Sequence, residues 1–228
     1  MNETPPPNHN GFHVRPARQP MFNVPPVTLW AAGAITAVFA FIQVAPSDWA
    51  NWIVFHFALL PERLVLAWAD PLGPYAFFGF GGLLLHTLVH VDWAHWALNT
   101  GFLVAFGAVC ERVFGPRRYI LLLLVATLAG SAAQLIAEWG TDFIMFGASG
   151  AVAGCFAGAC RLMIGSPDPR RRRTGWSLLI FLVGTNILFA VVGGAIFGVS
   201  GSIAWQAHLG GFVGGWLMAY PRVRFRPR

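Results

Sequence analysis

The stretch 143-FIMFGASGAVAGCFAGACRLMIGSPDPRRRR-173 decides the fold. It holds no charged residue before Arg161, and residues 161–173 then contain five arginines. A helix needs about 20 apolar residues to cross the hydrocarbon of a membrane, and arginines collect on the cytoplasmic side of such helices. The stretch therefore predicts a membrane-spanning helix that is followed by a cytoplasmic loop.

The composition of the whole chain agrees with this prediction. Of its 228 residues, 56% are hydrophobic and 11% are charged, with a mean hydropathy of +0.60, whereas a soluble domain carries about 25% charged residues. The net charge is +6 and every basic residue is arginine. Because these arginines flank apolar runs, they indicate membrane topology, and we expect no nucleic-acid partner. The three cysteines lie within apolar segments and are predicted to be buried.

Six apolar segments are long enough to span a membrane, which predicts an all-α, polytopic bundle. With a cytoplasmic N-terminus, fourteen of the fifteen arginines fall on the cytoplasmic side and six of the nine acidic residues fall on the outer side. Both termini are therefore predicted to be cytoplasmic. The predicted spans are Val27–Val44, Trp93–Cys110, Tyr119–Ala137, Phe143–Ile164, Trp176–Val199 and Ile203–Tyr220.

The remaining segments are two tails and one long loop. Residues 1–26 are predicted to be a flexible cytoplasmic tail without a signal peptide, and residues 221–228 a basic cytoplasmic tail, on either side of a membrane domain over residues 27–220. The loop from Pro46 to Asp92 contains Arg63, the one arginine on the outer side. Its apolar pieces are predicted to be interfacial or re-entrant rather than additional spans.

Three sets of polar residues lie within these spans, where polar groups are costly and often functional. His95 and Asn99 are four residues apart in 95-HWALN-99, so their side chains share one helix face. Ser149 lies near the outer end of its span, and His208 lies several residues into the last span. Each set also has a structural interpretation, as hydrogen-bonded contacts between helices or, for Ser149, as part of a small-residue packing face.

Taken together, these residues predict a catalytic site. Their three spans run in the same direction, so the four side chains are expected at a similar depth in the outer half of the membrane. Small residues recur at every fourth position and permit close approach of the helices. They are Gly150, Gly154 and Gly158 in one span and Ala207, Gly211 and Gly215 in the other. A serine, a histidine base and two donors suit acyl transfer by a Ser–His dyad, because no carboxylate lies in the core of these helices.

Three motifs carry a family resemblance. They are H-x-x-x-N as 95-HWALN-99, G-x-S-G as 147-GASG-150, and A-H-x-x-G-x-x-x-G as 207-AHLGGFVGG-215, each on the expected span. The histidine run 86-HTLVHVDWAH-95 and the G-x-x-x-E element 107-GAVCE-111 add to them. In these motifs the chain resembles the rhomboid family of intramembrane serine proteases. The resemblance implies a six-transmembrane-helix bundle with a long, partly membrane-embedded first loop, in the form common in bacteria, and so a bacterial plasma membrane.

The resemblance also implies roles for individual residues. Ser149 would be the nucleophile and His208 the general base, and the oxyanion would be held by the Ser149 backbone N–H with the His95 and Asn99 side chains. The implied substrates are single-span membrane proteins within the lipid bilayer, and no cofactor is implied. The glycines expected to pack around the site are Gly147, Gly150, Gly211 and Gly215.

Two features depart from the family pattern. Many members have an aromatic residue four positions after the nucleophile, packed on the catalytic imidazole. That position is Ala153 here, which leaves Trp205 or a residue of the fifth span to orient His208. Many members also carry a Trp-Arg pair in the first loop, and none occurs in this loop.

Two alternatives to a protease remain at this point. His86 and His90 are four residues apart and His95 is nearby, which is a spacing that chelates zinc, although no H-E-x-x-H carboxylate accompanies them and we expect no metal. A catalytically inactive rhomboid-like binder of membrane proteins is the other alternative. Such relatives usually lose the serine or the histidine, and both are present here.

Overall fold

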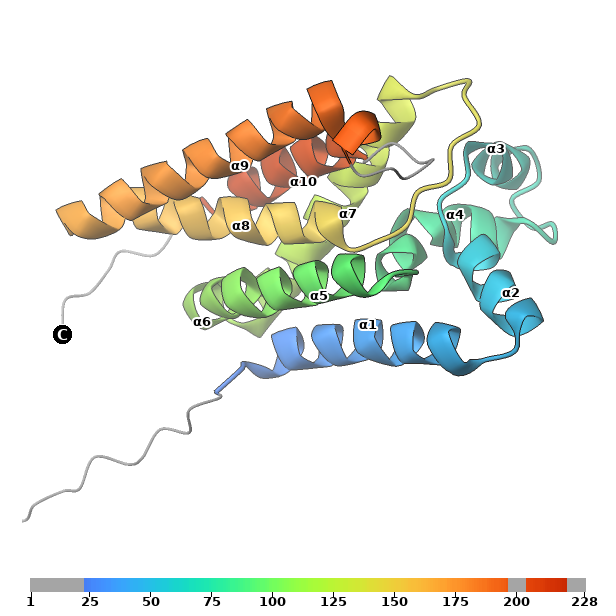
Figure 1. Ribbon diagram of the computed structural model, residues 1–228, viewed down its shortest axis with the longest axis horizontal. Helices are drawn as coiled ribbons and strands as arrows, with labels where there is room; N and C mark the ends of the chain where they lie inside the picture. Colours follow the sequence, from blue (N-terminus) through green and yellow to red (C-terminus); the bar gives the residue numbers. More distant parts are fainter. Residues whose placement is uncertain (1–22, 197–203, 221–228) are drawn as a thin grey trace, which may run out of the picture.

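The computed structural model describes residues 23–196 and 204–220, which form helices joined by short connections (Figure 1). No strand occurs among these residues, and one isolated antiparallel bridge joins Leu59 and Met145. The predicted all-α fold is therefore confirmed. Most of the predicted N-terminal tail, in residues 1–22, and the whole C-terminal tail lie outside the described residues.

Four helices are long and apolar enough to cross a membrane, so the chain is a multi-pass membrane protein. They are α1 (Pro26–Val44), the continuous run Trp93–Phe114, α7 (Pro116–Ala137) and α9 (Pro169–Ile196). The run comprises α5 (Trp93–Phe102), a π-helical turn (Leu103–Gly107) and α6 (Ala108–Phe114). Two further helices, α8 (Ser149–Ile164) and α10 (Trp205–Met218), are shorter. The number of six spans stays a prediction.

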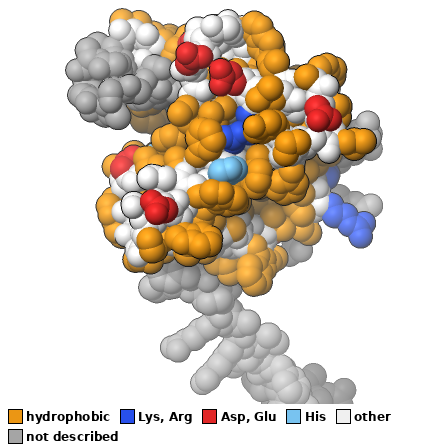
Figure 2. All heavy atoms as spheres, turned by 90° about the vertical axis from the view of Figure 1, so that its right-hand side faces the viewer, with side chains coloured by type: hydrophobic (Ala, Val, Ile, Leu, Met, Phe, Trp, Pro, Cys, Tyr) orange, Lys and Arg blue, Asp and Glu red, His pale blue; other side chains and the backbone are white. Residues whose placement is uncertain are grey.

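The segment between α1 and α5 forms three short helices at one end of the bundle (Figure 1). They are α2 (Ser47–Phe57), α3 (Pro61–Ala69) and α4 (Ala76–Leu85), the last extended by a 3-10 turn (His86–Leu88). Figure 2 looks onto this end, where carboxylates lie among hydrophobic side chains. Exposed tryptophans such as Trp49 and Trp68 are typical of segments at a membrane interface.

Arg63 connects α2 to α3. Its Nη1 donates hydrogen bonds to the carbonyls of Phe55 and His56, at 2.8 and 3.1 Å, and its guanidinium lies 4.3 Å from the centre of the Phe55 ring. These carbonyls are at the C-terminal end of α2, where a positive charge is favourable. Arg63 thus links α3 to the end of α2 in this loop, which has no Trp-Arg pair.

Glycines bring the backbones of α8 and α10 into direct contact. A Cβ atom on Gly211 would lie 2.0 Å from the carbonyl oxygen of Gly150, and one on Gly215 would lie 2.1 Å from that of Gly154. No side chain fits at such distances, so the two parallel helices touch at two successive turns. Since α10 also packs along α7, we call α7, α8 and α10 the glycine-packed unit.

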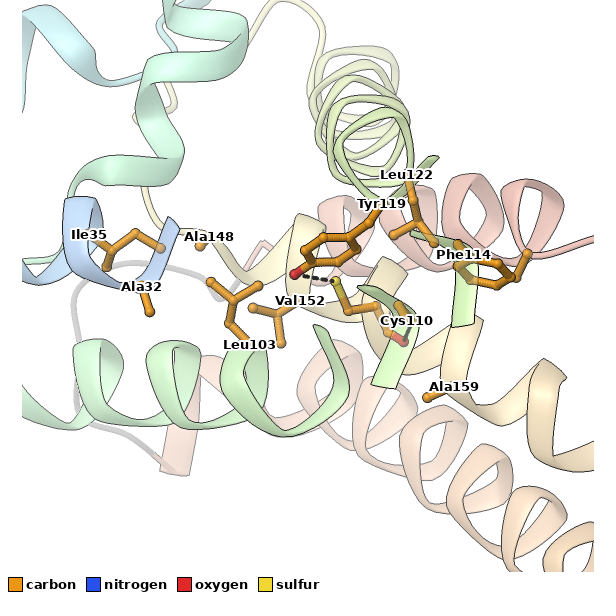
Figure 3. Close-up of a cluster of buried hydrophobic side chains, with 12 residues drawn as sticks. Ala32, Ile35, Leu103, Cys110, Phe114, Tyr119, Leu122, Ala148, Val152 and Ala159 are labelled. Atoms are coloured by element: carbon orange, nitrogen blue, oxygen red, sulfur yellow. Dashed lines mark hydrogen bonds between the residues drawn. The ribbon is translucent and has the colours of Figure 1, made fainter. Parts of the chain in front are cut away.

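A hydrophobic cluster fills the space between α1, the π-helical turn, α7 and α8 (Figure 3). The Tyr119 ring is fully buried in it, and a Cβ atom on Gly107 would meet the Tyr119 hydroxyl. The thiol of Cys155 lies 3.9 Å from that hydroxyl. All three cysteines are buried and unpaired, which confirms their predicted burial.

Glu111 joins α6 to the start of α1. Its buried carboxylate accepts hydrogen bonds from the backbone N–H groups of Val27 and Thr28, at 3.0 and 2.7 Å, and from the Thr28 hydroxyl at 2.8 Å. The first N–H groups of a helix have no partner within it, so these donors suit a carboxylate. This contact lies at the end of the bundle opposite to α2–α4 (Figure 1).

The boundaries of three predicted spans were wrong. The fifth was predicted to begin at Trp176, but α9 begins at Pro169. The fourth was predicted to begin at Phe143, but α8 begins at Ser149. Residues 143–148 are not helical because Gly147 has φ +109°, and because Met145 pairs through both its N–H and its carbonyl with Leu59. The second span was predicted to end at Cys110 but continues to Phe114. The predicted break between the fifth and sixth spans lies outside the described residues.

Candidate active site

Ser149 is the first residue of α8 and is half-buried. The segment before it arrives in an extended form and turns at Gly147, whose φ of +109° is rarely adopted by residues with a side chain. At a helix start the backbone N–H groups have no partner within the helix. The structure thus places the serine where a sharp turn meets the N-terminus of a helix.

His95 and Asn99 lie on the first turns of α5, beside this turn. The Asp92 carboxylate caps α5 by accepting a hydrogen bond from the His95 backbone N–H at 2.8 Å. The His95 ring lies against Gly147, because a Cβ atom there would be 2.5 Å from both Cε1 and Nε2 of the ring. The buried Asn99 donates from Nδ2 to the His95 carbonyl at 2.9 Å. The His95 side chain therefore adjoins the turn that leads into Ser149, and Asn99 lies one helical turn further along α5.

His208 reaches the same end of the bundle on α10. The carbonyl of Ala207 would be 3.3 Å from a Cβ atom on Gly150, so the residue before His208 touches the residue after Ser149. Between the side chains of Ser149 and His208, both within the described residues, no hydrogen bond is formed. The fold thus places Ser149 and His208 on adjoining helix turns, but their side chains are not hydrogen-bonded to each other.

His86 also supports the turn, a role that the sequence did not predict. Its backbone carbonyl accepts a hydrogen bond from the Gly147 N–H at 2.8 Å, and its Nδ1 lies 3.2 Å from the Gly147 carbonyl. Its Nε2 lies 3.0 Å from the Ser131 hydroxyl oxygen, and that hydroxyl donates its one proton to the Leu83 carbonyl at 3.0 Å. His86 therefore contacts both the N–H and the carbonyl of Gly147.

His90 supports the next residue. Its Nε2 accepts a hydrogen bond from the Ala148 N–H at 3.3 Å, and its ring centre lies 4.7 Å from that of His95. Burial, with a smaller contribution from the nearby His95, lowers the pKa of His90 to about 4, so the ring is neutral at pH 7 and able to accept. The spacing of this histidine run was visible in the sequence, but the contacts of its members with residues 147–148 were not.

The zinc alternative gains no support from this arrangement. Across residues 23–196 and 204–220, no three histidine, cysteine, aspartate or glutamate side chains are grouped as metal ligands. Instead, the ring nitrogens of His86 lie against the Gly147 carbonyl and the Ser131 hydroxyl of α7, and Nε2 of His90 accepts from the Ala148 N–H.

Comparison with known proteins identifies the family. Residues 79–225 match the Rhomboid domain, a range that includes His95, Asn99, Ser149 and His208. The chain belongs to the rhomboid family. Rhomboid relatives include the rhomboid protease GluP of Bacillus subtilis, 30% identical over 138 residues, which are 60% of this chain and 25% of GluP. The putative rhomboid protease YdcA of the same organism is 25% identical over 181 residues, which are 78% of this chain and 85% of YdcA.

A further relative has no activity in its name. The uncharacterized protein Rv1337 of Mycobacterium tuberculosis is 31% identical over 150 residues, which are 62% of this chain and 59% of Rv1337. The chain thus spans a quarter of GluP and about three fifths of this mycobacterial relative.

The candidate site differs from the expected family pattern at Ala153, which is buried on α8. Among the described residues, the ring that contacts the His208 imidazole is Phe189 of α9, with centroids 6.3 Å apart and planes at 65°. Trp205 makes no such ring contact with His208 among the described residues. The contacting aromatic residue therefore comes from the fifth predicted span, one of the two places that the sequence left open.

Proposed function

We propose that this protein is an intramembrane serine endopeptidase that cleaves single-span membrane proteins with Ser149 and His208. One observation carries the proposal. Gly150 abuts the carbonyl of Ala207, and Gly147 abuts the ring of His95, so three helices present a serine, a histidine and a donor pair at one end of the bundle. Family membership and relatives named as proteases support the same activity.

In the proposed reaction Ser149 Oγ attacks the carbonyl carbon of the scissile peptide while His208 accepts the hydroxyl proton. The tetrahedral intermediate collapses by breaking the C–N bond, and the imidazolium gives its proton to the leaving amine. Water then hydrolyses the Ser149 ester with His208 again as base. The missing hydrogen bond between the two side chains is compatible with this, because such bonds often tighten only when substrate is bound.

The backbone of the turn leaves one donor for the oxyanion. The N–H of Gly147 is bonded to His86, and the N–H of Ala148 is bonded to His90. Of the backbone N–H groups of residues 147–149, that of Ser149 alone has no acceptor within the described part of the chain. We propose that it stabilises the oxyanion together with the His95 and Asn99 side chains. His86 and His90 would then direct the turn so that this N–H stays available.

The proposed topology has six spans, with both termini on the arginine-rich, cytoplasmic side of a bacterial plasma membrane. The shorter helices α8 and α10 are the two spans that this adds to the four long ones. Their direct backbone contact supports the addition, because α7, the third member of the glycine-packed unit, is itself a long apolar helix. Ser149 would then lie in the outer half of the membrane.

A serine-directed fluorophosphonate tests the proposed chemistry on the purified full chain. We expect one equivalent of probe on Ser149, measured by intact mass, and no labelling of the Ser149→Ala and His208→Ala variants. His56→Ala is the matched control, because that histidine lies on α2 and contacts Trp52 and Phe78 instead of residues of the site. An unreactive wild-type protein would favour the alternative, an inactive rhomboid-like binder of membrane proteins.

A further inference from the structure

The backbone at His208 is firmly placed, but its imidazole is not held in the same way. On α10 the neighbouring Ala207 carbonyl abuts Gly130 of α7 and Gly150 of α8, so the helix has no freedom to shift there. The imidazole itself forms no hydrogen bond with another side chain in the described residues. An unrestrained histidine chooses among three χ1 wells and a broad χ2. Among the described residues, Phe189 supplies the aromatic ring that contacts the imidazole, and this contact limits its rotation.

Phe189 is carried by the least buried of the four long helices. Only 6% of the apolar stretch of α9 is buried, against 22–39% in the other three. The start of α9 is tightly placed, because a Cβ atom on Gly175 would lie 2.9 Å from atoms of both Met163 and Ile164 at the end of α8. From there α9 diverges from α8 toward the end that holds Ser149 (Figure 1). A small tilt about Gly175 therefore moves Phe189 relative to His208.

We propose that Phe189 is the positioning residue for the His208 imidazole, so that the tilt of α9 sets how often the base faces Ser149. The inference rests on the proposed function, since it assigns a partner to the proposed base. In this chain the imidazole is contacted by a residue of the loosely covered α9. Four residues after Ser149, α8 carries only the methyl group of Ala153. The single aromatic residue of α8, Phe156, packs on Phe106, with ring centroids 4.2 Å apart and planes tilted by 48°.

The experiment compares cleavage of one single-span substrate by full-length variants in liposomes of phosphatidylethanolamine and phosphatidylglycerol. We expect Phe189→Ala to lower kcat about two- to tenfold with KM unchanged, because an aromatic pair contributes about that factor. Phe189→Leu keeps the volume without the ring and should behave like Phe189→Ala, whereas Phe189→Tyr should restore kcat. The matched control, Leu188→Ala, removes the exposed neighbour on α9 and should leave kcat unchanged.

A double-variant cycle tests the role of the tilt. Gly175→Val crowds Met163 and Ile164, so we expect it to lower kcat in the wild-type background and to have no further effect with Phe189→Ala. Gly184→Val is the control, since a Cβ atom there meets nothing within 4 Å. Additive losses, or a Phe189→Ala protein with wild-type kcat, would overturn the inference. A wild-type protein that cleaves no better than Ser149→Ala would instead overturn the proposed function.

Discussion

Two neighbours of α8 are held in opposite ways. α10 touches α8 backbone to backbone, with glycines at two successive turns and α7 behind it. α9 meets α8 closely at Gly175 and is otherwise the least covered long helix. The two helices therefore contribute differently to the candidate site. The glycine-packed unit fixes the backbone positions of Ser149 and His208, whereas α9 carries Phe189, whose ring contacts the His208 imidazole. Substitutions in the two regions should therefore fail in different ways.

The largest effect is expected within the glycine-packed unit. Gly211→Leu places a side chain where a Cβ atom alone would be 2.0 Å from a backbone oxygen. Backbone cannot move aside as a side chain does, so we expect a loss of stability of about 3 kcal/mol or more and no probe labelling. Thermal unfolding in detergent, with labelling on the same samples, measures both. Gly184→Leu on α9 should match wild type, and equal behaviour of the two variants would contradict the comparison.

The next largest effect is expected at the turn before Ser149. Gly147→Ala combines a positive φ with a methyl group 2.5 Å from the His95 ring. Gly140→Ala is the matched control, since its φ is +83° but its surroundings are open. The backbone cost of about 1–2 kcal/mol should appear in both, whereas loss of fluorophosphonate labelling should appear only in Gly147→Ala. Labelling lost equally in both would mean that the His95 contact is unimportant.

A smaller effect, on stability alone, is expected at Glu111. Glu111→Gln removes the charge that accepts three hydrogen bonds from α1, which should cost about 1.5–3 kcal/mol. Because this contact is at the opposite end from Ser149, the labelling rate of the folded protein should not change. Chemical denaturation and labelling kinetics measure the two quantities. A labelling rate that falls with stability would show that the ends of the bundle are coupled.

The smallest effect is expected on the exposed side of α9. Ile187 is 60% exposed, and Ile187→Ala should change the free energy of unfolding by less than about 0.5 kcal/mol and leave kcat as it is. The same measurements on Phe189→Ala should show lower kcat at similar stability. If Ile187→Ala also lowers kcat, the effect of α9 on catalysis does not depend specifically on the Phe189 ring.

The membrane helices and the four candidate side chains follow from local patterns in the sequence. Hydropathy and arginine placement locate the long helices, and spacings of four put His95 with Asn99 on one face and Gly211 with Gly215 on another. The turn before Ser149 does not follow from such patterns. Residues 143–148 are apolar enough for helix, and only the pairing of Met145 with Leu59, far away in the sequence, shows that they are extended.

The same limit applies to the contacts of single side chains. Ala153 indicated that an aromatic contact would come from elsewhere, but Phe189 is one of twenty phenylalanines, and its neighbour is set by how α9 crosses α10. His86 and His90 likewise reach Gly147 and Ala148 through tertiary packing.

Proteolysis in a membrane tests the central claim most directly. The full-length protein and its Ser149→Ala variant are reconstituted in liposomes with a panel of single-span substrates, and the fragments are measured by mass. The account predicts cleavage within or next to the span by the wild-type protein and none by Ser149→Ala at equal reconstitution. Equal cleavage by both proteins would contradict it.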